Sequence, residues 1–132
     1  MLNVLVKTDT RYPVNRKIIR KAVLDTLNKN KAQRMVCEVS VFVVGERKMD
    51  ELTNLYLKDG KSHEVLSFPL DDNSSKGVGF VIPPDGILRL GDIVLCWPQV
   101  VLAAGRDEVM VDEEIYLLTS HSVEHLLGKH HD

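Results

Sequence analysis

Apolar residues at every second position along short segments of the chain predict β-strands. The pattern is clearest over residues 35–44, where one face is apolar and the other carries polar side chains. Segment 87–96 is a further predicted strand, and Gly91 inside it is expected at a bulge or where another backbone comes close. The remaining predicted strands cover residues 2–7 and 63–68 and, as a short one, 80–82.

Apolar residues three or four positions apart predict helices between these strands. The predicted helices span about 15–29, 46–58, 99–105 and 108–127. Asn15 can cap the first of them, and Gly60 and Gly128 are expected to end the second and the fourth. Because helices and strands alternate, we expect one mixed α/β domain over residues 1–132. Its single-layer sheet should have about four strands, mostly mixed or parallel, with helices packed against it.

The composition narrows the class of protein without giving a function. Lys and Arg number 17 against 19 Asp and Glu, a net charge of −2, so nucleic-acid binding would have to rest on a local patch. No apolar run approaches the roughly 18 residues of a membrane span, so we expect no membrane partner. Cys37 and Cys96 do not make a disulfide framework, and the cytoplasm is the expected location.

Histidines gather at the end of the chain, where four of the five lie within the last 12 residues. His121 and His125 are four residues apart on the last predicted helix, so both imidazoles can reach one metal ion. The helix also carries an apolar stripe, and we expect the pair to face the body of the protein. Gly128 can turn the chain back so that His131 becomes a third ligand. Three imidazoles and a water suit a catalytic zinc ion in a cleft beside this helix, and other divalent transition metals also bind imidazole.

The segment His121-Ser-Val-Glu-His125-Leu-Leu-Gly128-Lys-His-His131 resembles the H-G-x-L-H-L-x-G-x-D-H signature of the YbeY family of bacterial rRNA maturation factors. Two further segments resemble the same family in the same order. Glu64-Val-Leu-Ser-Phe-Pro69 is similar to its D-V-L-S-F-P strand, and Leu90-Gly-Asp-Ile-Val-Leu-Cys96 is similar to its L-G-D-I-V-I-C strand. Asn54 and Tyr56 approximate its N-x-x-Y-R helix end.

This resemblance implies a zinc-dependent single-strand endoribonuclease of small-subunit rRNA maturation and ribosome quality control. It further implies zinc on His121, His125 and His131, and RNA and ribosome-associated proteins as partners. The chain departs from the family at two charged positions. The family's functionally important arginine falls on Leu57, with Lys58 adjacent, and the Asp before the third histidine falls on His130.

Several further residues are candidates for roles around such a metal site. Lys58, Lys61 and Lys129 could neutralise charge on a phosphate, or belong to ordinary solvated surface. Asp92 could accept a hydrogen bond from a ligand histidine. Ser67 could line the cleft.

Other residues have two interpretations each. Cys96 is either a soft metal ligand or a buried thiol. A basic face on the first predicted helix could contact RNA phosphates or simply be solvated; it consists of Arg16, Lys17, Arg20 and Lys21.

Two alternative functions remain open on the sequence alone. The pattern His121-x-x-Glu124-His125 matches a metallopeptidase motif in which the glutamate is the general base, although Glu124 could equally be an exposed surface residue. The loss of the arginine at Leu57 and of the Asp at His130 could instead leave a catalytically weakened, zinc-binding protein that contacts rRNA or the ribosome.

Overall fold

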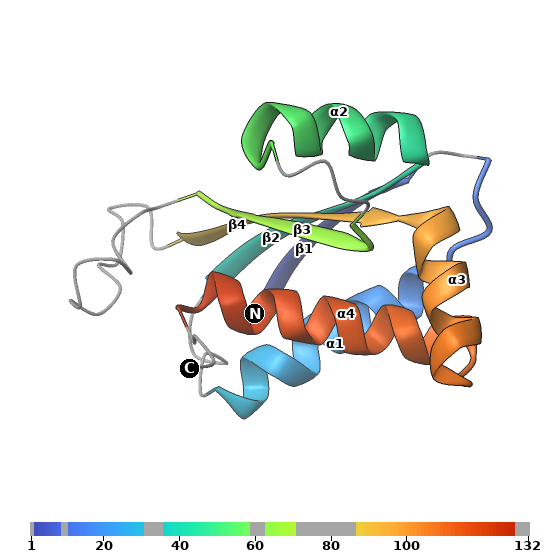
Figure 1. Cartoon of the computed structure of the whole chain (residues 1–132). Coiled ribbons are helices and arrows are strands. Elements are labelled where there is room, and N and C mark those ends of the chain that lie inside the picture. Colours follow the sequence, from blue (N-terminus) through green and yellow to red (C-terminus); the bar gives the residue numbers. More distant parts are fainter. Residues whose placement is uncertain (1, 9–10, 31–35, 59–62, 71–86, 129–132) are drawn as a thin grey trace.

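The computed structural model describes residues 2–8, 11–30, 36–58, 63–70 and 87–128. In chain order the elements are β1 (Leu2–Thr8), α1 (Arg16–Lys29), β2 (Val36–Val44), α2 (Glu46–Tyr56), β3 (Val65–Pro69), β4 (Ile87–Cys96), α3 (Trp97–Asp107) and α4 (Val111–Leu126) (Figure 1). The expected mixed α/β architecture is confirmed. The predicted strand at 80–82 lies outside the described residues.

The four strands form one mixed sheet in the order β1-β2-β4-β3. β1 pairs with β2 and β2 pairs with β4 in parallel, whereas β3 pairs with β4 antiparallel at the edge of the sheet. The parallel pairs follow from the helical crossovers, since parallel neighbours need a long connection such as a helix between them. The prediction of about four strands in mixed orientation is therefore confirmed.

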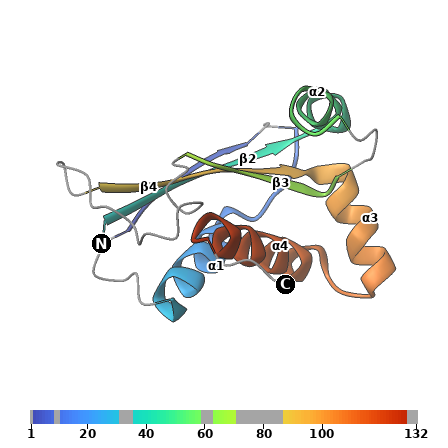
Figure 2. The ribbon, with the colours of Figure 1, turned by 60° about the vertical axis from the view of Figure 1, so that its left-hand side comes forward.

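Helices cover the two faces of the sheet unequally. α1 and α4 lie side by side on one face, and α2 lies on the other (Figures 1 and 2). The alternation predicted for β2 decides which residues meet each layer: every second residue is buried, among them Cys37 and Val39, and packs in the main core with Ile19 and Ile115. A smaller apolar cluster lies on the α2 face; it consists of Met49, Leu66, Val94 and Cys96.

Gly91 sits at both features that the sequence suggested for it, a bulge and a close backbone approach. The register of β2 against β4 shifts there, because Glu38 pairs with Arg89 and the next residue pairs with Gly91. Gly91 has φ +143°, and a Cβ atom on it would clash with the carbonyl oxygen of Phe68. The glycine therefore permits the bulge and the tight pairing of β3 with β4.

Two helix ends agree with the predicted signals. Asn15 caps α1, since its side-chain oxygen accepts a hydrogen bond from the Lys17 backbone N–H at 3.1 Å. Gly128 follows α4 with φ 83°, the left-handed conformation expected of a glycine at a helix end.

Other helix boundaries differ from the prediction for local reasons. α2 ends at Tyr56 rather than near Gly60, because Lys58 takes φ 54° and its N–H donates to the Thr53 carbonyl at 2.8 Å. α3 is longer than 99–105, since Pro98 fits the first turn, where no N–H donor is needed. No helix among the described residues is both long and apolar enough to span a membrane.

Candidate metal centre and its surroundings

His121 and His125 lie together near the C-terminal end of α4. Their Nε2 atoms are 2.9 Å apart, and the ring centroids are 4.4 Å apart with the rings at 88° to each other. The pair arises from helix geometry alone, because residues four apart lie one turn above each other on the same face. The two Nε2 lone pairs can therefore be directed at one point beside the helix.

The pair is more accessible than its position beside the apolar stripe suggests. His125 is half-buried, but His121 is exposed, so the expectation that both face the body of the protein is wrong for His121. The reason is the helical rotation of about 100° per residue. Ser122 is buried, and its neighbour His121 is carried round to the side of α4 that faces α1.

A groove between α1 and α4 opens beside the pair. It has a volume of about 320 Å³, and both His121 and Glu124 line it from α4. Asp25 and Lys29 line it from α1. A histidine, a half-buried carboxylate and a cation therefore share one accessible surface.

The donor set fits two of the ligands of a zinc ion. Zinc binds imidazole nitrogen at about 2.0–2.1 Å, so two ligands of a tetrahedral site stand about 3.3 Å apart. The observed separation of 2.9 Å between the Nε2 atoms is slightly shorter, and a small rotation of either ring would remove the difference. Within the ranges that the structure describes, no third His, Cys, Asp or Glu joins the pair. The predicted third ligand, His131, lies outside those ranges, as do His130 and Lys129.

Asp92 does not lie beside the histidine pair. Its cross-strand partner on β3 is Phe68, and both side chains line a groove on the α2 face, opposite to α4. Ser67 pairs with Ile93 instead, which places its side chain on the α4 face. The predicted role of Asp92 as an acceptor for a ligand histidine therefore has no support from its position, whereas Ser67 is on the correct side of the sheet.

Two residues after α2 lie on the far side of the sheet from α4. Lys58 is exposed, and Leu57, where the family arginine falls, is 47% exposed.

Cys96 is fully buried on the α2 face, and burial raises the pKa of its thiol, so it is an inert core residue rather than a metal ligand. Lys61 lies outside the described residues.

The basic face of α1 is exposed as expected, but two of its members are engaged within the protein. The Arg16 guanidinium donates to the Thr8 hydroxyl at 2.7 Å, and the Lys21 ammonium donates to Asp25 at 2.7 Å. Lys17 and Arg20 are exposed on the same helix. The ion pair with Asp25 therefore offsets the charge of Lys21, whereas Arg16 keeps its charge beside the neutral Thr8 hydroxyl.

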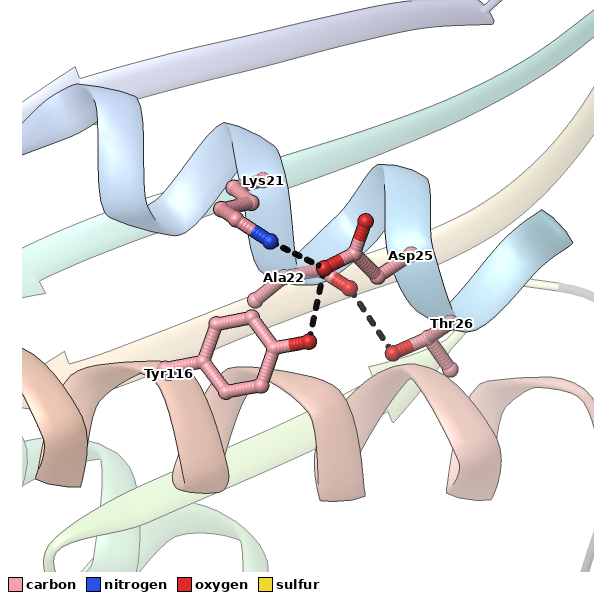
Figure 3. A network of polar contacts seen from close by, with 5 residues as sticks. All are labelled: Lys21, Ala22, Asp25, Thr26 and Tyr116. Carbon is pink, nitrogen blue, oxygen red and sulfur yellow. Dashed lines mark hydrogen bonds and ion pairs between the residues drawn. The ribbon is translucent and has the colours of Figure 1, made fainter. Parts of the chain in front are cut away.

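Sequence reasoning missed a polar network beside the pair that joins α1 to α4 (Figure 3). Tyr116 donates to the Asp25 carboxylate, which also accepts from Lys21. The hydrogen bond from Lys21, with that from Tyr116, lowers the pKa of Asp25, and the bond to Asp25 raises the pKa of Tyr116. The i, i+4 spacing of Lys21 and Asp25 could have predicted their ion pair from the sequence. The hydrogen bond from Tyr116 has no such signal, because Tyr116 is 91 residues from Asp25.

Known proteins match this chain along almost its whole length. The family model described as Endoribonuclease YbeY matches residues 5–132. A protein of Dehalococcoides mccartyi named endoribonuclease YbeY is 30% identical over 134 residues, 98% of this chain and 83% of the relative. One of the same name from Roseiflexus castenholzii is 33% identical over 119 residues, 90% and 72% of the two chains. The solution structure of a Thermotoga maritima protein shares the fold, with a TM-score of 0.58 at 20% identity over 100% of this chain and 75% of that one.

Proposed function

The chain belongs to the YbeY family of metal-dependent endoribonucleases, and from this we propose that it cleaves single-stranded RNA with zinc held by His121, His125 and His131. We further propose that it acts in small-subunit rRNA maturation and ribosome quality control, in the cytoplasm. Ribosome-associated proteins would then be its protein partners. One observation supports this most directly: the Nε2 atoms of His121 and His125 stand 2.9 Å apart on an accessible face of α4.

The histidines would act as neutral ligands in one tautomer. Metal binding through Nε2 requires the proton of each ring on Nδ1, so the hydrogen bonds of Nδ1 would orient the rings. A bound zinc ion supplies hydroxide near neutral pH, because it lowers the pKa of its water to about 7. The chain's own part is to hold the two imidazoles in place on a rigid helix, which α4 does through its buried residues Ile115 and Val123.

Two kinds of charged residue would assist at the RNA. Glu124 lines the groove with His121 and is half-buried, so its carboxylate could accept a proton or orient a water beside the scissile phosphate. Lys29 lines the same groove from α1 and could bind a phosphate oxygen. Lys58, Lys17 and Arg20 could hold the strand further away by contacts to phosphates, and Lys61, which lies outside the described residues, remains a candidate from the sequence alone.

The family match favours an endoribonuclease over the metallopeptidase that His121-x-x-Glu124-His125 also suggested. The weakened-enzyme alternative concerns this chain in particular. Leu57 offers no charge where the family's arginine falls, and its side chain is exposed rather than part of the core. We therefore keep catalytic weakness as a second hypothesis for the same metal site.

The metal content of untagged protein tests the proposal first. Mass spectrometry of the wild type should give about one zinc per chain, and His121→Ala and His125→Ala should each lose it. His63→Ala is the matched control, because this half-buried histidine precedes β3 and is expected to leave the zinc in place. An absence of zinc in the wild type even after zinc addition would overturn the proposal.

Cleavage of a labelled single-stranded RNA then separates the two hypotheses. An active nuclease should cut it in the wild type, stop after chelation and recover when zinc is added back. A zinc-loaded protein that binds the RNA but does not cut it would support the weakened alternative. Cleavage of a peptide with no action on RNA would favour the metallopeptidase.

A further inference from the structure

A second cavity lies on the face of the sheet opposite to the histidines, between α2 and strands β2, β3 and β4. We call it the α2 groove. Its volume of about 520 Å³ is in the range of small-ligand sites. Phe42, Phe68 and Val94 line it from the sheet, and Tyr56 lines it from α2. The groove is separate from the candidate metal centre, because the sheet lies between them (Figure 1).

Aromatic rings give this groove flat apolar surfaces. The Tyr56 and Phe68 ring centroids are 5.1 Å apart, with the ring planes at 59°. Tyr56 is 60% exposed, so part of its ring is open to an incoming ligand. Aromatic faces of this kind bind nucleobases by stacking, which is the main sequence-tolerant interaction in single-strand recognition.

One carboxylate lies among these apolar surfaces. The bulge at Gly91 puts Asp92 opposite Phe68 and directs its side chain into the groove. Asp92 is half-buried, and no described residue donates a hydrogen bond to its carboxylate or forms an ion pair with it. A partly buried carboxylate accepts hydrogen bonds strongly, so an occupant of the groove that offers N–H donors would be favoured.

A cation stands at another part of the same groove. Lys48 lines it from α2; its side chain is 59% exposed, and its ammonium lies 3.9 Å from the nearest oxygen of Glu51. Such a loose surface pair leaves the ammonium available for a stronger anion. The groove therefore combines aromatic faces, a hydrogen-bond acceptor and a positive charge, which match the base, the base edge and the phosphate of a nucleotide.

We propose that the α2 groove binds a guanine nucleotide of the RNA strand, with the base beside Phe68 and Tyr56 and its N–H edge on Asp92. This inference rests on the proposed function for its substrate class and adds the base that is selected. Guanine offers adjacent N1–H and N2–H donors that match the two oxygens of a carboxylate. Uracil offers one N–H between two carbonyl oxygens, which would repel Asp92. An arginine side chain of a protein would also match Asp92, but the ammonium of Lys48 disfavours a cationic occupant.

The groove can act together with the histidine pair because both lie towards the same end of the molecule. α2 and α4 end on the same side, with edge strand β3 between them (Figure 1). An RNA strand that crosses the β3 edge would reach both faces of the sheet. The groove would then select the base at a fixed distance from the cut.

Binding of single nucleotides to the zinc-free protein tests this without any cleavage. Calorimetry with GMP and UMP should show GMP at least about tenfold tighter, since one hydrogen bond to a charged acceptor changes affinity by roughly ten- to a hundredfold. Asp92→Asn should remove that preference, and Phe68→Leu should weaken GMP by roughly tenfold through lost stacking. Asp50→Asn is the matched control, because this exposed carboxylate of α2 does not line the groove.

Shift mapping of the unmodified protein by NMR keeps the test independent of how well the variants fold. GMP should move the amide signals of Phe42, Tyr56 and Val94. His121→Ala should still bind GMP normally, so failure of the metal centre leaves this result intact. Equal affinity for the two nucleotides, no binding at millimolar concentration, shifts confined to α4, or a preference for arginine amide over GMP would each overturn the proposal.

Discussion

The Tyr116 hydroxyl donates to an Asp25 carboxylate oxygen at 2.7 Å and so ties α4 to α1 (Figure 3). The same oxygen accepts from the Lys21 ammonium at 2.7 Å. The hydroxyl of Thr26, the residue after Asp25, donates to the Ala22 carbonyl and so has its own hydrogen bond within the helix. This network borders the groove that contains His121, so it stabilises the two helices that form the site.

Tyr116→Phe should lower the melting temperature by a few degrees, because the variant loses a hydrogen bond to a charged acceptor. Tyr56→Phe is the matched control: its ring is 60% exposed, and the variant should melt as the wild type does. Thermal unfolding followed by circular dichroism measures both. Equal melting of the two variants would contradict a stabilising role for the network.

The pH dependence of the Tyr116→Phe effect follows from the two shifted pKa values. The pKa of Asp25 is lowered, so its contribution is present above the ordinary value of 3.8 and is lost as the pH falls through the folded-state pKa. The pKa of Tyr116 is raised, so its contribution is present below the ordinary value of 10.0 and is lost as the pH rises through the folded-state pKa. The stability difference from the wild type should therefore shrink at both extremes.

Glu114→Gln should stabilise the protein at pH 7, because the variant removes a buried carboxylate whose charged form is disfavoured in the folded state. Glu114 is 4% exposed at the start of α4. Burial, together with the hydrogen bond to Asp107 and the charge of Glu64, raises its pKa, while Arg106 opposes this. Because the raised pKa means that folding favours the protonated form, the native state loses stability as the pH rises above about 4.5.

Denaturant unfolding at several pH values measures this difference. The advantage of Glu114→Gln should be small near pH 4, grow as the pH rises from 4.5 to the higher folded-state pKa, and then stay constant. Glu113→Gln is the control, since the side chain of Glu113 is exposed beside Glu114 in the chain and its substitution should give no comparable change. A constant difference at all pH values would show that Glu114 does not titrate in this way.

Lys58→Gly should raise stability by roughly 0.5–1 kcal/mol, because Lys58 holds the left-handed φ of 54° that costs most side chains about 1–2 kcal/mol. Lys58→Ala keeps the Cβ atom and loses the charge, so it should leave stability nearly unchanged. Comparing RNA cleavage by the two variants then isolates the charge. Equal losses of activity would show that the ammonium contributes, and full activity in both would remove Lys58 from the candidate cations.

Much of the fold could be predicted because its signals are local. The sequence pattern predicted the limits of β2 and β4 to within a residue, and Asn15 and Gly128 marked the ends of their helices. The ends at Lys58 and Glu108 could not be read in this way, since both are non-glycine residues with positive φ. Tertiary packing sets those conformations. A rule that ends each helix at the next glycine therefore places the end too far along the chain.

In the candidate site too, local features could be predicted from the sequence and long-range ones could not. The contact of His121 with His125 follows from helix geometry and was predictable. The position of Asp92 was not, because it depends on the bulge at Gly91 and on pairing with a strand that lies more than 20 residues earlier. The pairing of Asp25 with Tyr116 likewise joins residues that are distant in the chain and have no local signal.

Zinc should stabilise the folded protein if the histidine pair holds it. At a free concentration 100 times the dissociation constant, binding to the native state alone adds about 2.7 kcal/mol, which raises the melting temperature by roughly 10 °C for a chain of this size. The increase should disappear with a chelator and in His121→Ala. Magnesium is the control ion, because it prefers oxygen ligands, and an equal shift with magnesium would argue against an imidazole site.

Leu57→Arg tests whether the missing arginine limits this enzyme. Leu57 is 47% exposed directly after α2, so the substitution should change stability by no more than about 0.5 kcal/mol. A guanidinium can form two parallel hydrogen bonds to a phosphate, and one charge-assisted bond is worth about 1.5–3 kcal/mol. RNA cleavage by Leu57→Arg should therefore rise by roughly tenfold or more over the wild type.

Two further variants decide whether position and shape both matter. Leu57→Lys adds the charge without the planar fork and should give a smaller gain. Leu55→Arg places the same guanidinium on an exposed residue of the same helix end, 66% accessible, and should give none. If Leu57→Arg cleaves no better than Leu55→Arg, the absence of an arginine at position 57 does not limit RNA cleavage by this chain.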